Sequence, residues 1–65
     1  MKVTVNGESR ELPAGTTVAQ LIEHLQLGGR LAAERNGEIV PRSAHAATAL
    51  AEGDRIEIVR AIGGG

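Results

Sequence analysis

Apolar residues occupy every second position at the start of the chain, as they do in a half-buried β-strand. This alternation predicts a strand over residues 1–5. Asn6 and Gly7 follow, and both residue types tolerate the positive φ angles of a type I′ turn. The sequence therefore predicts a hairpin whose second strand covers residues 8–12 and is ended by Pro13.

A helical period replaces the alternation over residues 18–26. Thr17 and Gln20 have the spacing of a capping box, and Gly28 and Gly29 stand where a left-handed C-cap would end the helix. The apolar stripe consists of Val18, Leu21, Ile22 and Leu25. Burying four such side chains contributes roughly 6–12 kcal/mol, less than the roughly 10–20 kcal/mol needed to order ten backbone residues. The helix must therefore lie across a sheet.

The second half of the chain repeats the hairpin signal. Asn36 and Gly37 separate a predicted strand over residues 31–35 from a short strand over residues 38–40. An alanine-rich connector with one helical turn leads to a last strand over residues 55–61. The element order indicates an α+β domain in which one helix packs on one sheet.

The inward positions of this last strand are Ile56 and Ile58, which are expected to pack with Val3 and Val5 beneath the helix. The outward positions are Arg55, Glu57, Val59 and Ala61. Of the two outward apolar residues, Val59 interrupts an otherwise polar face.

Charge and composition exclude several classes of partner. Seven Lys and Arg against eight Asp and Glu give a net charge of -1, which argues against nucleic acids and anionic membranes. The basic residues are scattered among the acids along the chain, which predicts a mixed, solvated surface. Without aromatic residues there is no platform for base stacking, and without cysteine there is no disulfide or thiolate-bound metal.

The length of 65 residues indicates one small domain with too little interior for an enclosed active site. No apolar run approaches the roughly 20 residues of a membrane span, and the first residues lack a signal-peptide core. We therefore expect a cytoplasmic protein, monomeric when free.

Few side chains are candidates for chemistry. His24 flanks the apolar stripe without a second histidine one turn away, so a solvated position is favoured over a metal site. Ser43, His45 and Asp54 supply the residue types of a catalytic triad, but two of them share one short loop that has no room for an oxyanion hole. We expect neither a metal site nor a catalytic triad.

The chain ends in three glycines, residues 63–65, which we expect to form a flexible tail behind a domain over residues 1–62. A frayed end is the simplest interpretation. However, the tail continues directly from a core strand, and glycine lacks the Cβ that would obstruct a narrow channel. From Ile62 to Gly65 the extended chain reaches roughly 13 Å, enough to enter a partner's active site while the domain docks outside.

Three segments together with the Gly-Gly end resemble the ThiS family of sulfur carriers in thiamine biosynthesis. These segments are VTVNGE at 3–8, NGEIVPRS at 36–43 and EGDRIEI at 52–58. The resemblance covers essentially the whole chain, which departs from the pattern at the additional Gly63. It implies a ubiquitin-like β-grasp fold, in which a mixed sheet curls around one helix and the first and last strands lie parallel at its centre.

The resemblance also implies a co-substrate rather than an enzyme. An E1-like partner of the ThiF type would use Mg-ATP to adenylate the carboxylate of Gly65, while the chain itself binds no cofactor. Sulfur from a cysteine desulfurase or another sulfur donor would then give a thiocarboxylate, which a thiazole synthase of the ThiG type consumes. Partners would recognise the tail at Gly63 and Gly64. The expected docking residues are Val59, Ala61 and Ile62.

Three alternatives remain at this stage. A sulfur carrier for molybdopterin synthesis would use the same chemistry, although such chains are usually longer between the helix and the last strand. A ubiquitin-like modifier would join its terminus to lysines. A binding module would carry the glycines as an inert end.

Overall fold

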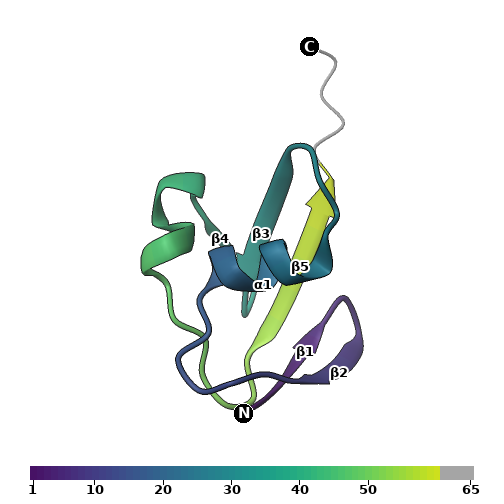
Figure 1. Cartoon of the computed structure of the whole chain (residues 1–65), viewed down its shortest axis with the longest axis vertical. Coiled ribbons are helices and arrows are strands. Elements are labelled where there is room, and N and C mark those ends of the chain that lie inside the picture. The colour runs from purple at the N-terminus through teal and green to yellow at the C-terminus, as the bar shows by residue number, and fades with distance from the viewer. Residues whose placement is uncertain (61–65) are drawn as a thin grey trace.

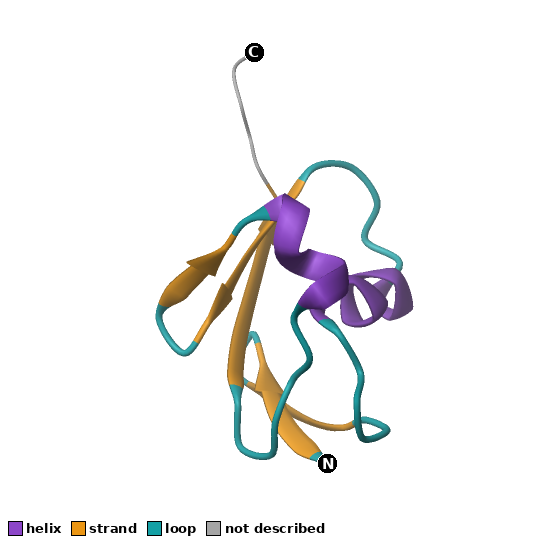
Figure 2. Ribbon diagram, turned by 90° about the vertical axis from the view of Figure 1, so that its left-hand side faces the viewer, coloured by secondary structure: helices purple, strands orange, loops and turns teal. Residues whose placement is uncertain are grey.

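A mixed sheet of five strands carries both helical segments on one of its faces (Figures 1 and 2). The computed structural model describes residues 1–60. Its elements are β1 (Lys2–Val5), β2 (Glu8–Glu11), α1 (Val18–Leu25), β3 (Leu31–Arg35), β4 (Glu38–Val40), the 3-10 helix η1 (Arg42–Ala47) and β5 (Arg55–Arg60). The predicted α+β class and the predicted element order are confirmed.

The sheet has the order β2-β1-β5-β3-β4, so the first and last strands meet at its centre. β1 and β5 run parallel, with Thr4 beside Arg55 and Val5 beside Ile56, while the other neighbours are antiparallel. This is the β-grasp arrangement that the resemblance implies. Because the parallel pairing stops at Ile56, the second half of β5 extends beyond β1.

The side chain of Asn6 completes the sheet at that point. Its amide nitrogen donates to the carbonyl of Ile58 at 3.2 Å, and its amide oxygen accepts from the Ile58 backbone N–H at 2.8 Å.

The two Asn-Gly turns have nearly the same backbone conformation. Asn6 has φ 50° and Gly7 has φ 82°, while Asn36 has φ 51° and Gly37 has φ 87°. Both predicted hairpin turns are therefore confirmed.

Helix α1 begins as predicted and ends earlier than predicted. Thr17 accepts from the backbone of Gln20 at 3.1 Å while Gln20 accepts from that of Thr17 at 3.0 Å, which completes the capping box. The C-cap is Gln26, with φ 55°, so the assignment of the cap to Gly28 and Gly29 was wrong. A non-glycine residue in this conformation costs roughly 1–2 kcal/mol, which packing of the preceding turn on the sheet must offset. The two glycines instead shape the loop to β3.

The core lies between α1 and the sheet. Its buried members are Val3, Val5, Leu12, Val18, Leu21, Ala33, Leu50, Ile56 and Ile58. Ile22 and Leu25 are partly buried against this cluster, so the predicted stripe does face the sheet. Leu12 was expected to end the second strand, but β2 stops at Glu11 and Leu12 turns into the core.

Two of the predicted strand boundaries lie near the ends of the chain. β1 starts at Lys2, one residue later than predicted, while the amino group of Met1 donates to the carbonyl of Leu12 at 2.6 Å. Ala61, the predicted last residue of the final strand, lies outside the described residues. No helix within residues 1–60 has the length and apolar character that a membrane span requires.

Candidate functional site

The end of β5 is the first candidate site, because the chain continues from there to its glycines (Figure 1). Arg60 is the last residue of this strand and also the last described residue. The other residues predicted to react or dock lie outside the described part: Ala61, Ile62, Gly63, Gly64 and Gly65. Of the predicted site, the structure therefore describes only Val59.

Val59 lies on the outer face, which we define as the face of the sheet turned away from α1. Its side chain is 55% exposed, while that of the preceding Ile58 is 4% exposed and packs in the core. This alternation places Arg55, Glu57 and Val59 outward, as predicted.

Strand pairing adds two neighbours that the sequence analysis missed. Ala32 of β3 lies directly opposite Val59, and Ile39 of β4 is 74% exposed and opposite the outward Glu34. Residues on diagonal positions of neighbouring strands lie about 7–8 Å apart, so Ile39 reaches towards Ala32. Ala32, Ile39 and Val59 form the outer apolar patch. Only the strand register identifies this patch. In the sequence, Ile39 is followed by the apolar Val40, so the local pattern does not show which of the two side chains points outward.

Asp54 lies at the other end of β5 in a network of hydrogen bonds. Its carboxylate accepts from Arg35 Nε at 2.8 Å, from Asn36 Nδ2 at 3.0 Å and from the Ala51 backbone N–H at 2.8 Å. Asn36 in turn accepts from the Arg55 backbone N–H at 2.9 Å. The network joins the turn before β5 to the hairpin between β3 and β4.

The pKa of Asp54 lies below its ordinary value of 3.8 because of this network. Burial by itself raises the pKa, but the hydrogen bonds from Asn36, Ala51 and Arg35, with the charge of Arg35, outweigh that effect. The folded state therefore holds the ionised carboxylate.

Two of the three residues considered for a catalytic triad, His45 and Asp54, are engaged in other contacts. His45 is buried at 9% exposure with Nε2 3.0 Å from the carbonyl oxygen of Val40, and Asp54 is occupied by Arg35. His45 thereby ties η1 to β4, a role that the alanine-rich sequence around it does not reveal. Within residues 1–60 no three acidic or histidine side chains lie close enough together to hold a metal ion.

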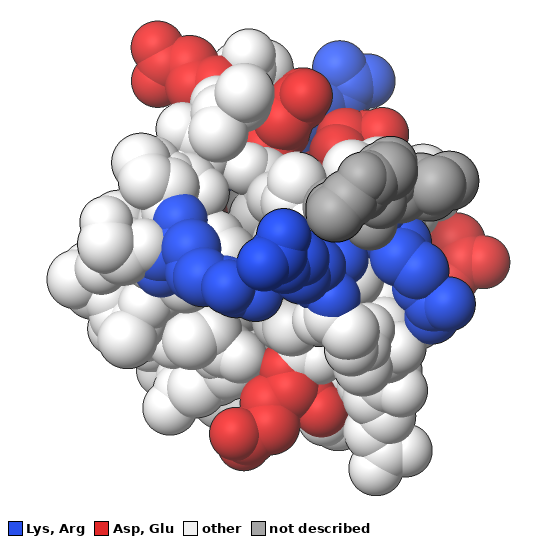
Figure 3. Space-filling model, turned by 90° about the horizontal axis from the view of Figure 1, so that it is seen from above, with Lys and Arg blue, Asp and Glu red and all other residues white. Residues whose placement is uncertain are grey.

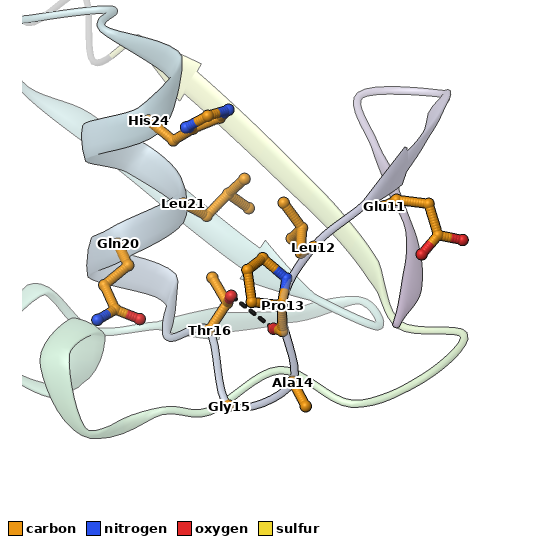
Figure 4. A pocket seen from close by; sticks show the side chains of 9 residues that line it. All are labelled: Glu11, Leu12, Pro13, Ala14, Gly15, Thr16, Gln20, Leu21 and His24. Atoms are coloured by element: carbon orange, nitrogen blue, oxygen red, sulfur yellow. Dashed lines mark hydrogen bonds between the residues drawn. The ribbon is translucent and has the colours of Figure 1, made fainter.

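A groove of about 560 Å³ separates α1 from the end of β2 and the loop that follows it (Figure 4). Leu12 and Leu21 line it together with the exposed His24 at one end. The carboxylate of Glu11 points away from His24 in Figure 4, and Thr16 Oγ1 donates to the carbonyl of Pro13 at 2.7 Å. His24 and Glu11, the two titratable side chains that line the groove, do not converge on one point, so it offers no catalytic constellation.

Comparison with known proteins gives one consistent family. The model of the ThiS family matches residues 3–65. A crystal structure of a thiamine biosynthesis protein (ThiS) from Geobacter metallireducens superposes with a TM-score of 0.87 at 32% identity, covering 100% of both chains. A solution structure of a thiamine biosynthesis protein from the same organism gives 0.78 at 32% identity, over all of this chain and 88% of the other.

Two curated relatives are longer proteins. The whole chain is 48% identical to a segment of a thiazole synthase from Paramagnetospirillum magneticum and 42% identical to a segment of one from Magnetococcus marinus. The chain spans 20% of the length of each of these relatives.

Proposed function

This chain belongs to the ThiS family, and we propose that it carries sulfur for thiamine biosynthesis as a thiocarboxylate on Gly65. The match of the family model to residues 3–65 carries the proposal, because it includes both the β-grasp domain and the terminal glycines. The superposition on the Geobacter protein over the full length of both chains supports it. In this proposal the chain is a co-substrate of its partner enzymes.

The chemistry begins with a carboxylate. A terminal carboxyl group has a pKa of about 3.3–3.7, so at neutral pH it is ionised and is a poor electrophile. An E1-like partner would let the Gly65 carboxylate oxygen attack the α-phosphorus of ATP, which expels pyrophosphate and forms an acyl-adenylate. The terminal sulfur of a desulfurase persulfide would then displace AMP, and a thiol would cleave the acyl disulfide to leave the thiocarboxylate. The chain contains no cysteine, so no side-chain thiol competes for this role.

We propose a thiazole synthase as the acceptor of the sulfur. Two relatives named thiazole synthase contain a segment that matches this whole chain, which supports a functional link between the domain and that enzyme. The thiocarboxylate formed on this chain would be offered in parallel to thiazole synthase and to the large subunit of molybdopterin synthase. Transfer to the thiazole synthase alone is the expected result.

The test of the carrier function is the intact mass of the chain. Incubation with the E1-like enzyme of the organism that encodes this chain, together with Mg-ATP and a sulfur donor, is expected to raise the mass by the difference between one sulfur and one oxygen atom. Fragmentation is expected to place this change at Gly65 and so also to establish that Gly65 carries a free carboxyl group. Omission of ATP is the control. An unchanged mass, with a partner shown to be active, would contradict the proposal.

A second prediction concerns docking of the domain through the outer apolar patch. Val59→Asp is expected to weaken binding to the adenylating partner about tenfold or more, because a charge would be buried without a partner in a contact that excludes water. Val59 is largely exposed, so the fold is expected to remain intact. Calorimetric titration measures the binding, and circular dichroism checks the fold.

The matched control is Ser9→Asp, which introduces the same side chain at an exposed position on the edge strand β2. Ser9 lies on the same outer face, two strands away from Val59. Equal binding by the wild type, Val59→Asp and Ser9→Asp would show that this patch is not the docking surface.

A further inference from the structure

Basic side chains gather at the end of the sheet from which the chain continues towards its glycines. Figure 3 looks onto this end and shows Lys and Arg side chains in a band across it, with acidic side chains on either side of the band. The chain as a whole has a net charge of -1, so composition does not predict such a concentration.

Strand direction and register identify three arginines at this end. Arg60 closes β5 and lies opposite Leu31, so Arg30 directly precedes the partner residue on β3. Arg42 follows β4 by two residues, beyond the pair formed by Ala33 and Val40. β5, β3 and β4 are neighbours in the sheet and about 4.8 Å apart, so the register brings Arg60, the residue before β3 and the first residue of η1 to the same end of the sheet. We call Arg30, Arg42 and Arg60 the arginine end.

All three side chains are exposed. Arg60 Nη2 donates to the carbonyl of Leu27 at 2.9 Å, which holds its guanidinium just beyond the C-terminus of α1. The ion pairs found within residues 1–60 join Met1 to Glu11 and Arg35 to Asp54, so none of them involves the arginine end. Three positive charges thus face solvent around the exit of the chain.

We infer that the arginine end binds carboxylates at the mouth of the channel into which the adenylating partner takes the glycine tail. This inference rests on the proposed function, since only then does this end of the domain face an active site. Guanidinium groups bind carboxylates with two parallel hydrogen bonds, and such contacts both orient an encounter and accelerate it. The occupant is therefore an acidic protein rim.

The length of the tail indicates whether the arginine end binds this acidic rim or the phosphates of ATP. Residues 61–65 span up to roughly 17 Å when extended. When the Gly65 carboxylate reaches the α-phosphate, the arginines therefore remain near the entrance of the channel. Their charge acts on docking of the carrier, and they do not contact the reacting atoms.

The experiment measures ATP–pyrophosphate exchange with the double variant Arg30→Gln/Arg42→Gln. Both arginines are exposed, and Arg60 is left in place because it donates to the carbonyl of Leu27, just beyond α1. The KM for the carrier is expected to rise about tenfold with an unchanged rate at saturation, since charges at the rim of an interface mainly affect association. The KM for ATP is expected to stay the same.

Salt dependence provides the second readout. Raising the NaCl concentration is expected to increase the KM for the wild-type carrier, and this increase is expected to be smaller for the double variant. The matched control is Arg55→Gln, which removes an exposed arginine at the opposite end of β5. Its KM is expected to stay within about twofold of wild type.

The possible results separate the inference from the proposed function. If the double variant matches Arg55→Gln in both KM and salt dependence, the inference is overturned while the carrier function stands. A rise in the KM for ATP alone would assign the arginines to phosphate and would also overturn it. Absence of exchange by the wild type would remove the proposed function and this inference together.

Discussion

Replacing Gly64 with valine is expected to lower adenylation of Gly65 by roughly 100-fold or more without changing the melting temperature. A β-branched side chain would collide with the walls of a channel shaped for glycine, and valine resists a positive φ angle. Misplacing the reacting carboxylate by about 1 Å is enough to cost about 100-fold in rate. The core within residues 1–60 is unaltered, so thermal unfolding is expected to coincide with that of the wild type.

ATP–pyrophosphate exchange measures the adenylation, and two further variants serve as controls. Gly64→Ala adds only a methyl group and is expected to give an intermediate loss. A chain with one residue added after Gly65 is expected to be as inactive as Gly64→Val, because its carboxylate passes beyond the α-phosphate.

The inactive chains provide a direct test of docking. Gly64→Val is expected to inhibit exchange by the wild type, since its domain still occupies the partner. Equal exchange by all of these chains would show that no active site recognises the tail, and the binding-module alternative would then be favoured.

Replacing Asp54 with alanine is expected to destabilise the domain by about 2–3 kcal/mol, because the donors to this partly buried carboxylate would be left without an acceptor. Arg35 Nε, Asn36 Nδ2 and the Ala51 N–H would all lose their acceptor. A chain of this length has a total stability of only about 3–10 kcal/mol. The variant is therefore expected to lose a large fraction of the stability of the domain, as urea denaturation followed by circular dichroism at 25 °C would measure.

Glu52→Ala is the matched control because it removes a carboxylate from the same turn. Glu52 is exposed and accepts only from the backbone N–H of Lys2 at 3.0 Å among the described residues. Its loss is expected to cost less than about 1 kcal/mol. Similar midpoints for Asp54→Ala and the wild type would show that the network contributes little to stability.

The same network predicts a loss of stability in acid. The pKa of Asp54 is lower in the folded state than in the unfolded chain, so the unfolded chain binds the proton more tightly. The stabilisation by Asp54 is complete above its ordinary pKa of 3.8 and is lost as the pH falls through the folded pKa. Asp54→Asn removes the titratable group. The free energy of unfolding of this variant, measured by urea denaturation, is therefore expected to fall less steeply as the pH drops below the ordinary pKa of 3.8.

Local interactions explain why so many elements could be predicted from the sequence. The two Asn-Gly turns need only residues that accept positive φ angles, and both form at the expected positions. The capping box between Thr17 and Gln20 spans three residues, and the stripe of α1 follows from a period of 3.6 residues. The proposed tail chemistry stays a prediction, and it too was derived without tertiary structure, because a main-chain carboxylate needs no folded pocket of its own to be activated by a partner.

Other features depend on which segments meet. The left-handed cap falls on Gln26 rather than on a glycine because packing of α1 on the sheet, and not local preference, decides where the chain turns. His45 is buried in η1, which packs beside α1, and its Nε2 lies 3.0 Å from the carbonyl oxygen of Val40. The residues next to Gln26 and His45 in the sequence do not predict either feature.

The proposed docking surfaces show the same division. The alternation of β5 by itself placed Val59 outward, whereas only the register of β3, β4 and β5 brings Ala32 and Ile39 to the same patch. In the sequence Arg30, Arg42 and Arg60 stand far apart, but in the fold the register of β3, β4 and β5 brings them to one end of the sheet. Charges interact over about 10 Å and apolar side chains act by direct contact. Both depend on which residues are neighbours in space, so their grouping is decided by tertiary structure even where each element is determined locally.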